Sequence, residues 1–160
     1  MSLASADFLW YPLANFELVV PRSVMEEIEN IKAKPETNAV AEKILSTKSK
    51  FTIIRPKRTA AGPHRGEEDG LQACTELGIE ILILDDFRAV RKLKPMSISR
   101  GVKLLLSVFF VGHAASSGKI SEEEAFTIFD RMAERRDWVG GRVYLAGKDF
   151  LERELKKLRR

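Results

Sequence analysis

Hydrophobic and polar positions along the chain alternate between a spacing typical of strands and a spacing typical of helices. Short apolar runs predict strands at 16–21 (FELVVP), 51–56 (FTIIRP) and 79–84 (IEILIL). Between them, apolar residues recur at helical spacing, as with Val24, Ile28 and Ile31 in the segment 22–34. Strands that alternate with helices predict an α/β layered fold with a mostly parallel sheet.

The third apolar run and the segment after it carry the most specific expectations. IEILIL is almost wholly apolar, which predicts a central strand buried on both faces. A helix is expected to begin at Phe87 and to stop at Pro95. The residues 96–99 (MSIS) then read as a brief extended piece, and 100–118 as one long buried helix.

The C-terminal part of the chain predicts two further helices. Ser121 with Glu124 three residues later is a capping box at the start of a helix. A final amphipathic helix covers 148–158 (KDFLERELKKL). The 160 residues fit one domain, in which 121–160 is a C-terminal helical extension.

Composition narrows the class of protein. No apolar run approaches the ~18 residues of a membrane span, which favours a cytoplasmic protein without a membrane partner. One cysteine and two histidines exclude an internal disulfide and a zinc cluster. The net charge of +4, with basic clusters at 48–58, 87–94 and the C-terminus, is mild support for a polyanionic partner.

Two adjacent carboxylates end the third strand. In a parallel α/β sheet, ligands bind beyond the carboxyl ends of the strands, where Asp85 and Asp86 lie. Two neighbouring carboxylates repel each other unless a cation or a basic side chain lies between them. The alternative is that Asp86 caps the following helix while Asp85 pairs with a nearby arginine.

Two glutamates add to this acidic end. Glu27 lies at the edge of the apolar stripe of its helix, and Glu67 lies on the same side of its helix as Cys74, whereas Asp69 faces away. Glu27, Glu67 and Asp85 or Asp86 are therefore expected to converge. Ligands that are all oxygens favour Mg²⁺ or Mn²⁺.

Four segments in this order resemble the PIN domain family, in particular the small prokaryotic PIN-like proteins related to VapC toxins. They are VVPRSVMEEIENI, GEEDGLQACTELG, ILILDDFRAVRKL and SISRGVKLLLSVFFVGHAASSGKIS, within residues 17–122. The resemblance implies a three-layer α/β/α sandwich with a mostly parallel central sheet. It also implies a divalent-metal-dependent ribonuclease, with RNA as substrate, an antitoxin protein as candidate partner and a homodimer as candidate assembly.

The resemblance assigns roles to individual side chains. Glu27, Glu67 and Asp85 are the expected metal ligands, and Asp86 is a ligand or a helix cap. Asp69 and Asp7 are further candidate ligands. Ser99 is expected to orient a water or contact a phosphate. The candidate RNA-binding residues are Arg88, Arg91, Lys92 and Arg65, with His64 beside the last.

The N-terminus departs from the family pattern. The strand that usually ends in Asp-Ser or Asp-Thr is not seen before Val19, and Asp7 is the sole aspartate there. Either that strand is missing, with a start upstream of Met1, or the N-terminus is rebuilt. An impaired PIN-like module that binds RNA or protein is therefore the alternative to an active nuclease. A receiver-like signalling domain also uses paired aspartates, but it places them at its first strand.

Overall fold

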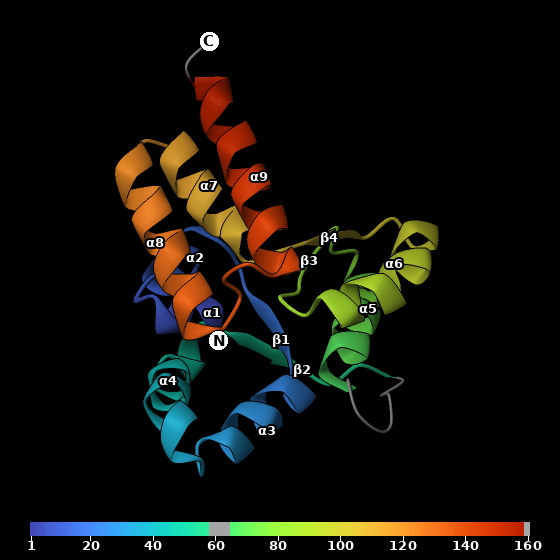
Figure 1. Cartoon of the computed structure of the whole chain (residues 1–160). Coiled ribbons are helices and arrows are strands. Elements are labelled where there is room, and N and C mark those ends of the chain that lie inside the picture. Colours follow the sequence, from blue (N-terminus) through green and yellow to red (C-terminus); the bar gives the residue numbers. More distant parts are fainter. Residues whose placement is uncertain (58–64, 159–160) are drawn as a thin grey trace.

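The computed structural model of the chain describes residues 1–57 and 65–158, in which helices enclose short parallel strands. The strands are β1 (Val19–Pro21), β2 (Thr52–Ile54), β3 (Ile81–Ile83) and β4 (Lys103–Leu105). β1 pairs with β2 in parallel, and β3 pairs with β4 in parallel. The predicted mixed α/β class with parallel pairing is confirmed. Within the described residues, however, the strands form two separate pairs rather than one central sheet (Figure 1).

Helices account for most of the remaining described residues. They are α1 (Ser2–Ser5), α2 (Trp10–Asn15), α3 (Arg22–Ile31), α4 (Pro35–Ser46), α5 (Arg65–Leu77), α6 (Phe87–Ser99), α7 (Val108–Ser116), α8 (Glu122–Arg135) and α9 (Arg142–Leu158), with a 3₁₀ turn at Lys48–Lys50. The capping box predicted at Ser121 begins α8, because the Ser121 hydroxyl accepts the Glu124 N–H and the Glu124 carboxylate accepts the Ser121 N–H. Each described helix is too short or too polar to cross a bilayer.

Two predictions for the segment after Asp86 are wrong. Pro95 lies inside α6 instead of ending it, and the residues 96–99 are helical rather than extended. Pro95 removes one backbone hydrogen bond, but the buried side chains of Leu93 and Ser97 hold the helix in place. α6 ends before Gly101, whose φ of +69° suits glycine.

The long helix predicted over 100–118 is divided in two. Its first part is β4, which pairs with β3, and only Val108–Ser116 is helical as α7. A short run of leucines is compatible with a buried strand and with a buried helix. The conformation of residues 103–105 therefore depends on their pairing with β3.

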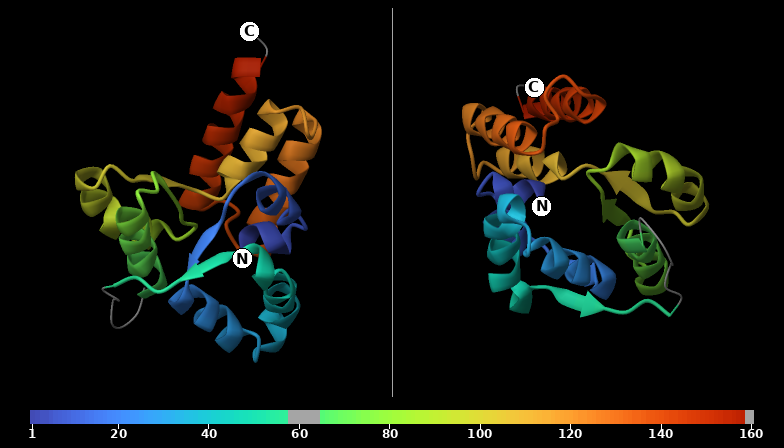
Figure 2. Two further views of the ribbon diagram at one scale, coloured as in Figure 1. Left: turned by 180° about the vertical axis from the view of Figure 1, so that it is seen from behind. Right: turned by 60° about the horizontal axis from the view of Figure 1, so that its bottom comes forward.

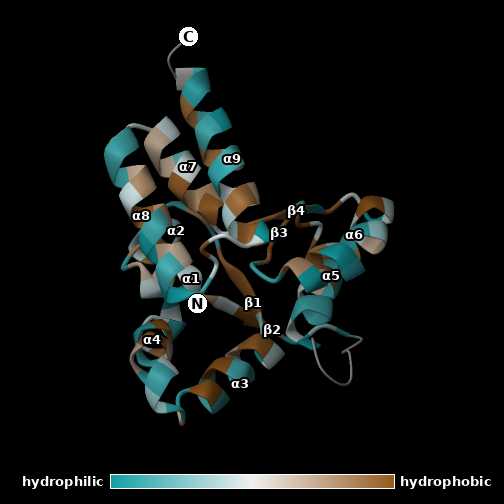
Figure 3. Cartoon of the chain, in the orientation of Figure 1, coloured by the Kyte–Doolittle hydropathy of each residue, from teal (hydrophilic) through white to brown (hydrophobic). Residues whose placement is uncertain are grey.

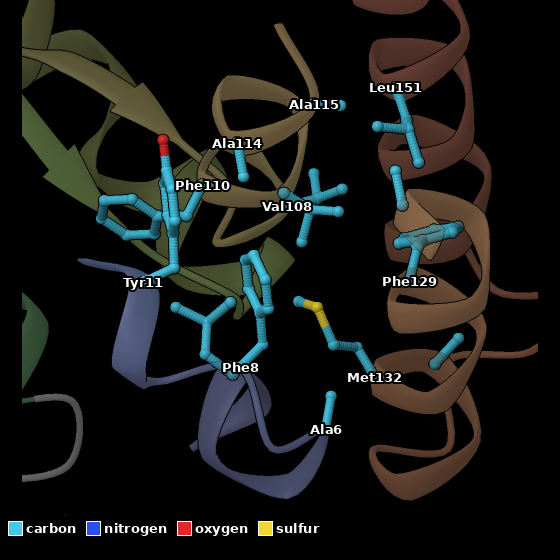
Figure 4. Close-up of a cluster of buried hydrophobic side chains, with 14 of the residues drawn as sticks. Ala6, Phe8, Tyr11, Val108, Phe110, Ala114, Ala115, Phe129, Met132 and Leu151 are labelled. Atoms are coloured by element: carbon cyan, nitrogen blue, oxygen red, sulfur yellow. The ribbon is translucent and has the colours of Figure 1, made fainter. Parts of the chain in front are cut away.

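Three hydrophobic clusters make up the interior. The largest joins the N-terminal residues Phe8 and Tyr11 to α7, α8 and α9, and Figure 4 shows Met132 directed toward Phe8 within it. The second lies between α3 and α4, and the third between α5, α6 and β3. Figure 2 shows the α7–α9 group and the α3–α4 group at opposite ends of the molecule, with the α5–α6 group to one side.

Candidate functional site: a cavity between the strand pairs

A cavity of about 590 Å³ separates the two strand pairs, and we call it the inter-sheet cavity. Its lining comes from β1, from the segment 81–86, from α3 and α5, from residues 1–3 and from the start of α7. Figure 3 shows that β1 is largely hydrophobic, and the lining residues 81–84 are all isoleucine or leucine. The polar lining is therefore concentrated at a few side chains. Four of these are the predicted carboxylates Glu27, Glu67, Asp85 and Asp86.

Glu27 and Glu67 form the first part of the polar lining. The Glu27 carboxylate accepts a hydrogen bond from the backbone N–H of Gly66, at the N-terminal end of α5. Burial, followed by the negative charge of Glu67, raises the pKa of Glu27 above its ordinary value, although Gly66 and Arg65 act in the opposite direction. Glu67 is thus close enough for its charge to disfavour ionisation of Glu27.

Gly66 is needed where α5 approaches Glu27. A Cβ atom on residue 66 would lie 2.9 Å from Val24 Cγ2 and 3.0 Å from Glu27 Oε1. Any larger residue would therefore push the Glu27 carboxylate away from the α5 N-terminus. The local sequence at 65–67 positions both the hydrogen bond donor and the second glutamate.

Asp85 is held by the protein's own donors. The Ser2 hydroxyl donates to Oδ2 at 2.5 Å, and Ser107 donates through its backbone N–H to Oδ1 at 2.9 Å and through its hydroxyl to Oδ2 at 2.8 Å. The Met1 amino group is nearby: burial lowers its pKa, the Asp85 charge opposes this effect, and Arg136 adds to it. The alternative in which Asp85 pairs with an arginine is wrong, because the Asp85 carboxylate accepts its hydrogen bonds from Ser2 and Ser107.

Asp86 is the N-cap of α6. Its Oδ1 accepts the backbone N–H groups of Arg88 at 2.7 Å and of Ala89 at 3.2 Å. The alternative interpretation of Asp86 as a helix cap is confirmed. A capping carboxylate satisfies backbone donors that the first turn of a helix would otherwise leave without partners.

The four carboxylates are brought to one cavity but not to one point. Among the described residues, no three His, Cys, Asp or Glu side chains lie close enough together to enclose a metal ion. Glu27 and Glu67 are the pair whose charges interact most directly. Mg²⁺ is commonly held by one or two carboxylates together with waters and substrate phosphates, and this pair meets that requirement.

The other predicted metal ligands lie outside the cavity lining. Asp7 is exposed and forms an ion pair with Lys43, which lowers the pKa of Asp7. The prediction that Asp69 faces away from the interior is wrong, because it is 1% exposed and accepts the Ser23 hydroxyl at 2.6 Å. Arg65 Nε lies 3.5 Å from the same carboxylate oxygen, Asp69 Oδ2. Asp69 ties α5 to α3.

Ser99 has a structural position rather than a place in the cavity. It is the last residue of α6, and its hydroxyl donates to the Met96 carbonyl oxygen. The expected extended segment would have carried Ser99 to the acidic end of a sheet. Because 96–99 is helical, Ser99 is exposed on α6 instead.

The predicted RNA-binding residues divide into two groups. Arg65 forms ion pairs with Asp69 and Glu26, and Lys92 forms an ion pair with Glu68 at 2.5 Å. Arg88 and Arg91 are exposed on α6, shortly after the cavity residue Asp86. His64 lies outside the described residues.

Sequence reasoning missed the groups that surround Asp85. Ser2, Ser107 and Arg136 all line the cavity, and each comes from a segment far from Asp85 in the chain. Ser107 directly precedes α7, a position where serine is common, so the sequence held a weak signal for a cap but none for a contact with Asp85.

Searches against known family models, curated proteins and solved structures found no match.

Proposed function

We propose that the chain is a divalent-metal-dependent ribonuclease that hydrolyses RNA phosphodiester bonds at the acidic end of the inter-sheet cavity. The observation that carries this proposal is the common location of Glu27, Glu67, Asp85 and Asp86. These are the carboxylates that the resemblance to PIN domains assigns to catalysis. They reach one cavity from three separate parts of the chain.

Glu27 and Glu67 would hold Mg²⁺ or Mn²⁺. When bound, such an ion supplies Lewis-acid stabilisation of phosphate charge and lowers the pKa of a coordinated water. The raised pKa of Glu27 supports this assignment, because a cation between two glutamates would relieve their repulsion. Gly66 fixes the position of the Glu27 carboxylate through its N–H.

The remaining residues would position the substrate. Asp85 is fixed in the cavity wall by Ser2 and Ser107, so its carboxylate would repel a phosphate from this side of the cavity. Arg88 and Arg91 on the exposed side of α6 carry positive charges that attract a phosphate backbone. Asp86 orients the first turn of α6, from which Arg88 projects.

We also infer that the two strand pairs belong to one layer of an α/β/α arrangement. α5 contacts both β1 and β3 on one side. On the other side, Leu18 and Ile83 both pack against the cluster formed by α7, α8 and α9. Helical groups thus cover both faces across the cavity, as a three-layer fold requires.

A second candidate function is a non-catalytic module that binds RNA or another protein. The observation in its favour is that the oxygens of Asp85 and Oδ1 of Asp86 already accept hydrogen bonds from the chain itself. Such carboxylates are less available as ligands. Arg88 and Arg91 would serve this function without a metal ion.

Cleavage of single-stranded RNA in the presence of Mn²⁺ tests the first proposal. Glu27→Gln should abolish cleavage and should also abolish the rise in melting temperature that Mn²⁺ causes in the unaltered protein. Glu29→Gln is the matched control, because Glu29 lies on the same helix, pairs with Lys48 and is absent from the cavity lining.

Two results would decide against a nuclease. Equal cleavage by Glu27→Gln and the unaltered protein would remove the metal site from the mechanism. RNA binding that weakens with salt in both proteins, without cleavage in either, would establish the non-catalytic module instead.

A further inference from the structure

Among residues 1–57 and 65–158, the two strands that border the inter-sheet cavity, β1 and β3, each have one edge without a neighbouring strand. Leu18 accepts a hydrogen bond from Thr52, so alternate residues of the β1 segment face β2 and Val19 faces the opposite edge. Glu80 and Leu84 bond to the β4 segment, so Ile81 and Ile83 face away from β4. Within the described residues, no backbone group bonds to the main chain of these three outward-facing residues. The Cys74 thiol donates a weak hydrogen bond to the Ile81 carbonyl oxygen at 3.7 Å.

The cavity meets both strands along these edges. Successive side chains of a strand point to opposite faces, so a cavity on one face would touch every second residue. The inter-sheet cavity instead touches the consecutive residues of β1 and all of Ile81–Leu84. It therefore lies between β1 and β3 at the level of the strands themselves.

Helical groups cover this space from both sides. α5 packs against β1 and β3, and Gly70 of α5 lies so close to β3 that an added Cβ would be 3.0 Å from Leu82 Cδ1. On the opposite side, Leu18 and Ile83 contact the same hydrophobic cluster. The empty space thus has the surroundings of a strand in a layered α/β protein.

The β3 sequence is more apolar than its position requires. A strand that is apolar at successive positions suits the middle of a sheet, yet Ile81 is 39% exposed. An unpaired apolar edge is a site at which another strand adds, and two-stranded sheets are marginally stable alone. The wall therefore offers apolar surface together with main-chain groups of Val19 and Ile83 and the N–H of Ile81, which bond to no other described residue.

We propose that the inter-sheet cavity binds an extended apolar segment of a second polypeptide, which adds as a β-strand between β1 and β3. Main-chain groups on both sides of the added strand would bond to Val19 on one edge and to Ile81 and Ile83 on the other. A small apolar ligand would leave those groups without partners, whereas a peptide satisfies them. This interaction site goes beyond the proposed nuclease function and does not depend on it.

The chemistry of the occupant follows from the walls. Both faces of the added strand would lie under helices, so uncharged β-branched and aliphatic residues are required at successive positions. The strands of this chain already pair with each other, which favours a different polypeptide over a second copy. The added strand joins the observed pairs into a single sheet.

A synthetic peptide with a core of Thr-Val-Ile-Val-Val-Thr and a lysine at each end for solubility is a direct probe. Amide hydrogen exchange at Val19, Ile81 and Ile83 should slow about tenfold when the peptide is present at ten times its Kd. A peptide of the same composition with N-methyl groups on alternate core residues should bind more weakly, because it can form hydrogen bonds on one side only.

Each other outcome overturns the proposal. Equal binding of the N-methylated peptide would show apolar partition without strand addition. Absence of binding at millimolar peptide, or slowed exchange confined to other residues, would exclude the site. Slow exchange at these residues without peptide, together with a dimer in solution, would assign the edges to a second copy. Peptide binding is measured without a divalent metal ion and without RNA, which separates this test from that of the nuclease.

Attachment of the peptide to Met1 provides a second measurement. Residues 1–3 line the cavity, so a short Gly-Ser linker from Met1 places the peptide beside it at high effective concentration. The melting temperature of this fusion should rise independently of protein concentration. A fusion that carries proline at two core positions should not show the rise, and an equal rise in both would contradict strand addition.

Discussion

The four carboxylates of the inter-sheet cavity differ in the hydrogen bonds and neighbouring charges that the rest of the chain provides. Asp85 accepts three hydrogen bonds from serines, and Asp86 accepts two from the backbone of α6. Glu27 receives one N–H but lies next to Glu67, and its pKa is raised. A bound cation would therefore stabilise the charge of Glu27 more than that of Asp85 or Asp86.

The pH dependence of stability tests the environment of Glu27. A raised folded pKa means that the native state binds this proton more tightly than the unfolded chain does. The stabilisation is therefore full below pH 4.5 and is lost as the pH rises through the raised value. Glu27→Gln cannot lose it, so the variant should gain in melting temperature relative to the unaltered protein as the pH rises above 4.5.

Glu29→Gln is the control of opposite sign. Its ion pair with Lys48 lowers the pKa of Glu29, so Glu29 stabilises the fold above pH 4.5 and loses that effect as the pH falls. This variant should become less stable than the unaltered protein as the pH rises, by a small amount that salt reduces. Parallel pH profiles for the two variants would show that Glu27 is not destabilised by burial and by Glu67.

At the scale of elements, helix starts depend on local side chains that hold backbone N–H groups. Asp86 caps α6, and Ser121 caps α8 with reciprocal support from Glu124. Both caps were visible in the sequence, since each depends on residues within three positions. The distant partner of a strand has no such local signal, which is why β4 was mistaken for helix.

Substitutions of Asp86 test its contribution to stability as the N-cap of α6. Asparagine is as good an N-cap as aspartate, so Asp86→Asn should keep the free energy of unfolding nearly unchanged, whereas Asp86→Ala should lose about 1 kcal/mol. Denaturant titration of both variants measures this difference. If Asp86→Asn is as unstable as Asp86→Ala, the charge rather than the cap holds the start of α6.

Ser121→Ala tests the other cap. Loss of the hydroxyl that accepts the Glu124 N–H should lower the free energy of unfolding by roughly 0.5–2 kcal/mol. Ser99→Ala is the control, because this exposed hydroxyl at the end of α6 contacts only the Met96 carbonyl oxygen and its loss should cost less than about 0.5 kcal/mol. An equal loss in both variants would remove the special role of the capping box.

At the scale of the whole molecule, α9 is held by close packing on α7 and α8. Gly147 allows this contact, since a Cβ atom there would lie 2.7 Å from Phe129 Cε2. Phe129 is 1% exposed and stacks on Tyr144 of α9 at 5.4 Å between ring centres. The C-terminal helices are thus part of the largest core.

Gly147→Ala tests this packing. Alanine favours a helix over glycine by about 1 kcal/mol, but overpacking of a core costs about 1–3 kcal/mol, so we expect a net loss in the free energy of unfolding. In a background of Phe129→Leu, which removes the contacting ring atoms, the same substitution should be stabilising. A double-mutant cycle by denaturant titration measures the coupling, and additive effects would contradict the contact.

Sequence patterns determined what depends on neighbouring residues. The positions of β1, β2, β3 and α3, the caps at Asp86 and Ser121, and the candidate carboxylates all follow from spacing within one element, and the structure places Glu27, Glu67, Asp85 and Asp86 around one cavity. Asp69, by contrast, was assigned to the wrong side of its helix, because a helical wheel does not show that Ser23 and Arg65 surround it.

The tertiary structure alone decided how these elements combine. Whether the leucines at 104–105 form strand or helix depends on β3, which is more than twenty residues away in the chain. The partners of Asp85 are Ser2, at the N-terminus, and Ser107, 22 residues further along the chain. The separation of the strands into two pairs leaves a cavity that no local pattern encodes. Local spacing fixes the direction of a side chain within its element, whereas contacts between distant elements depend on packing in three dimensions.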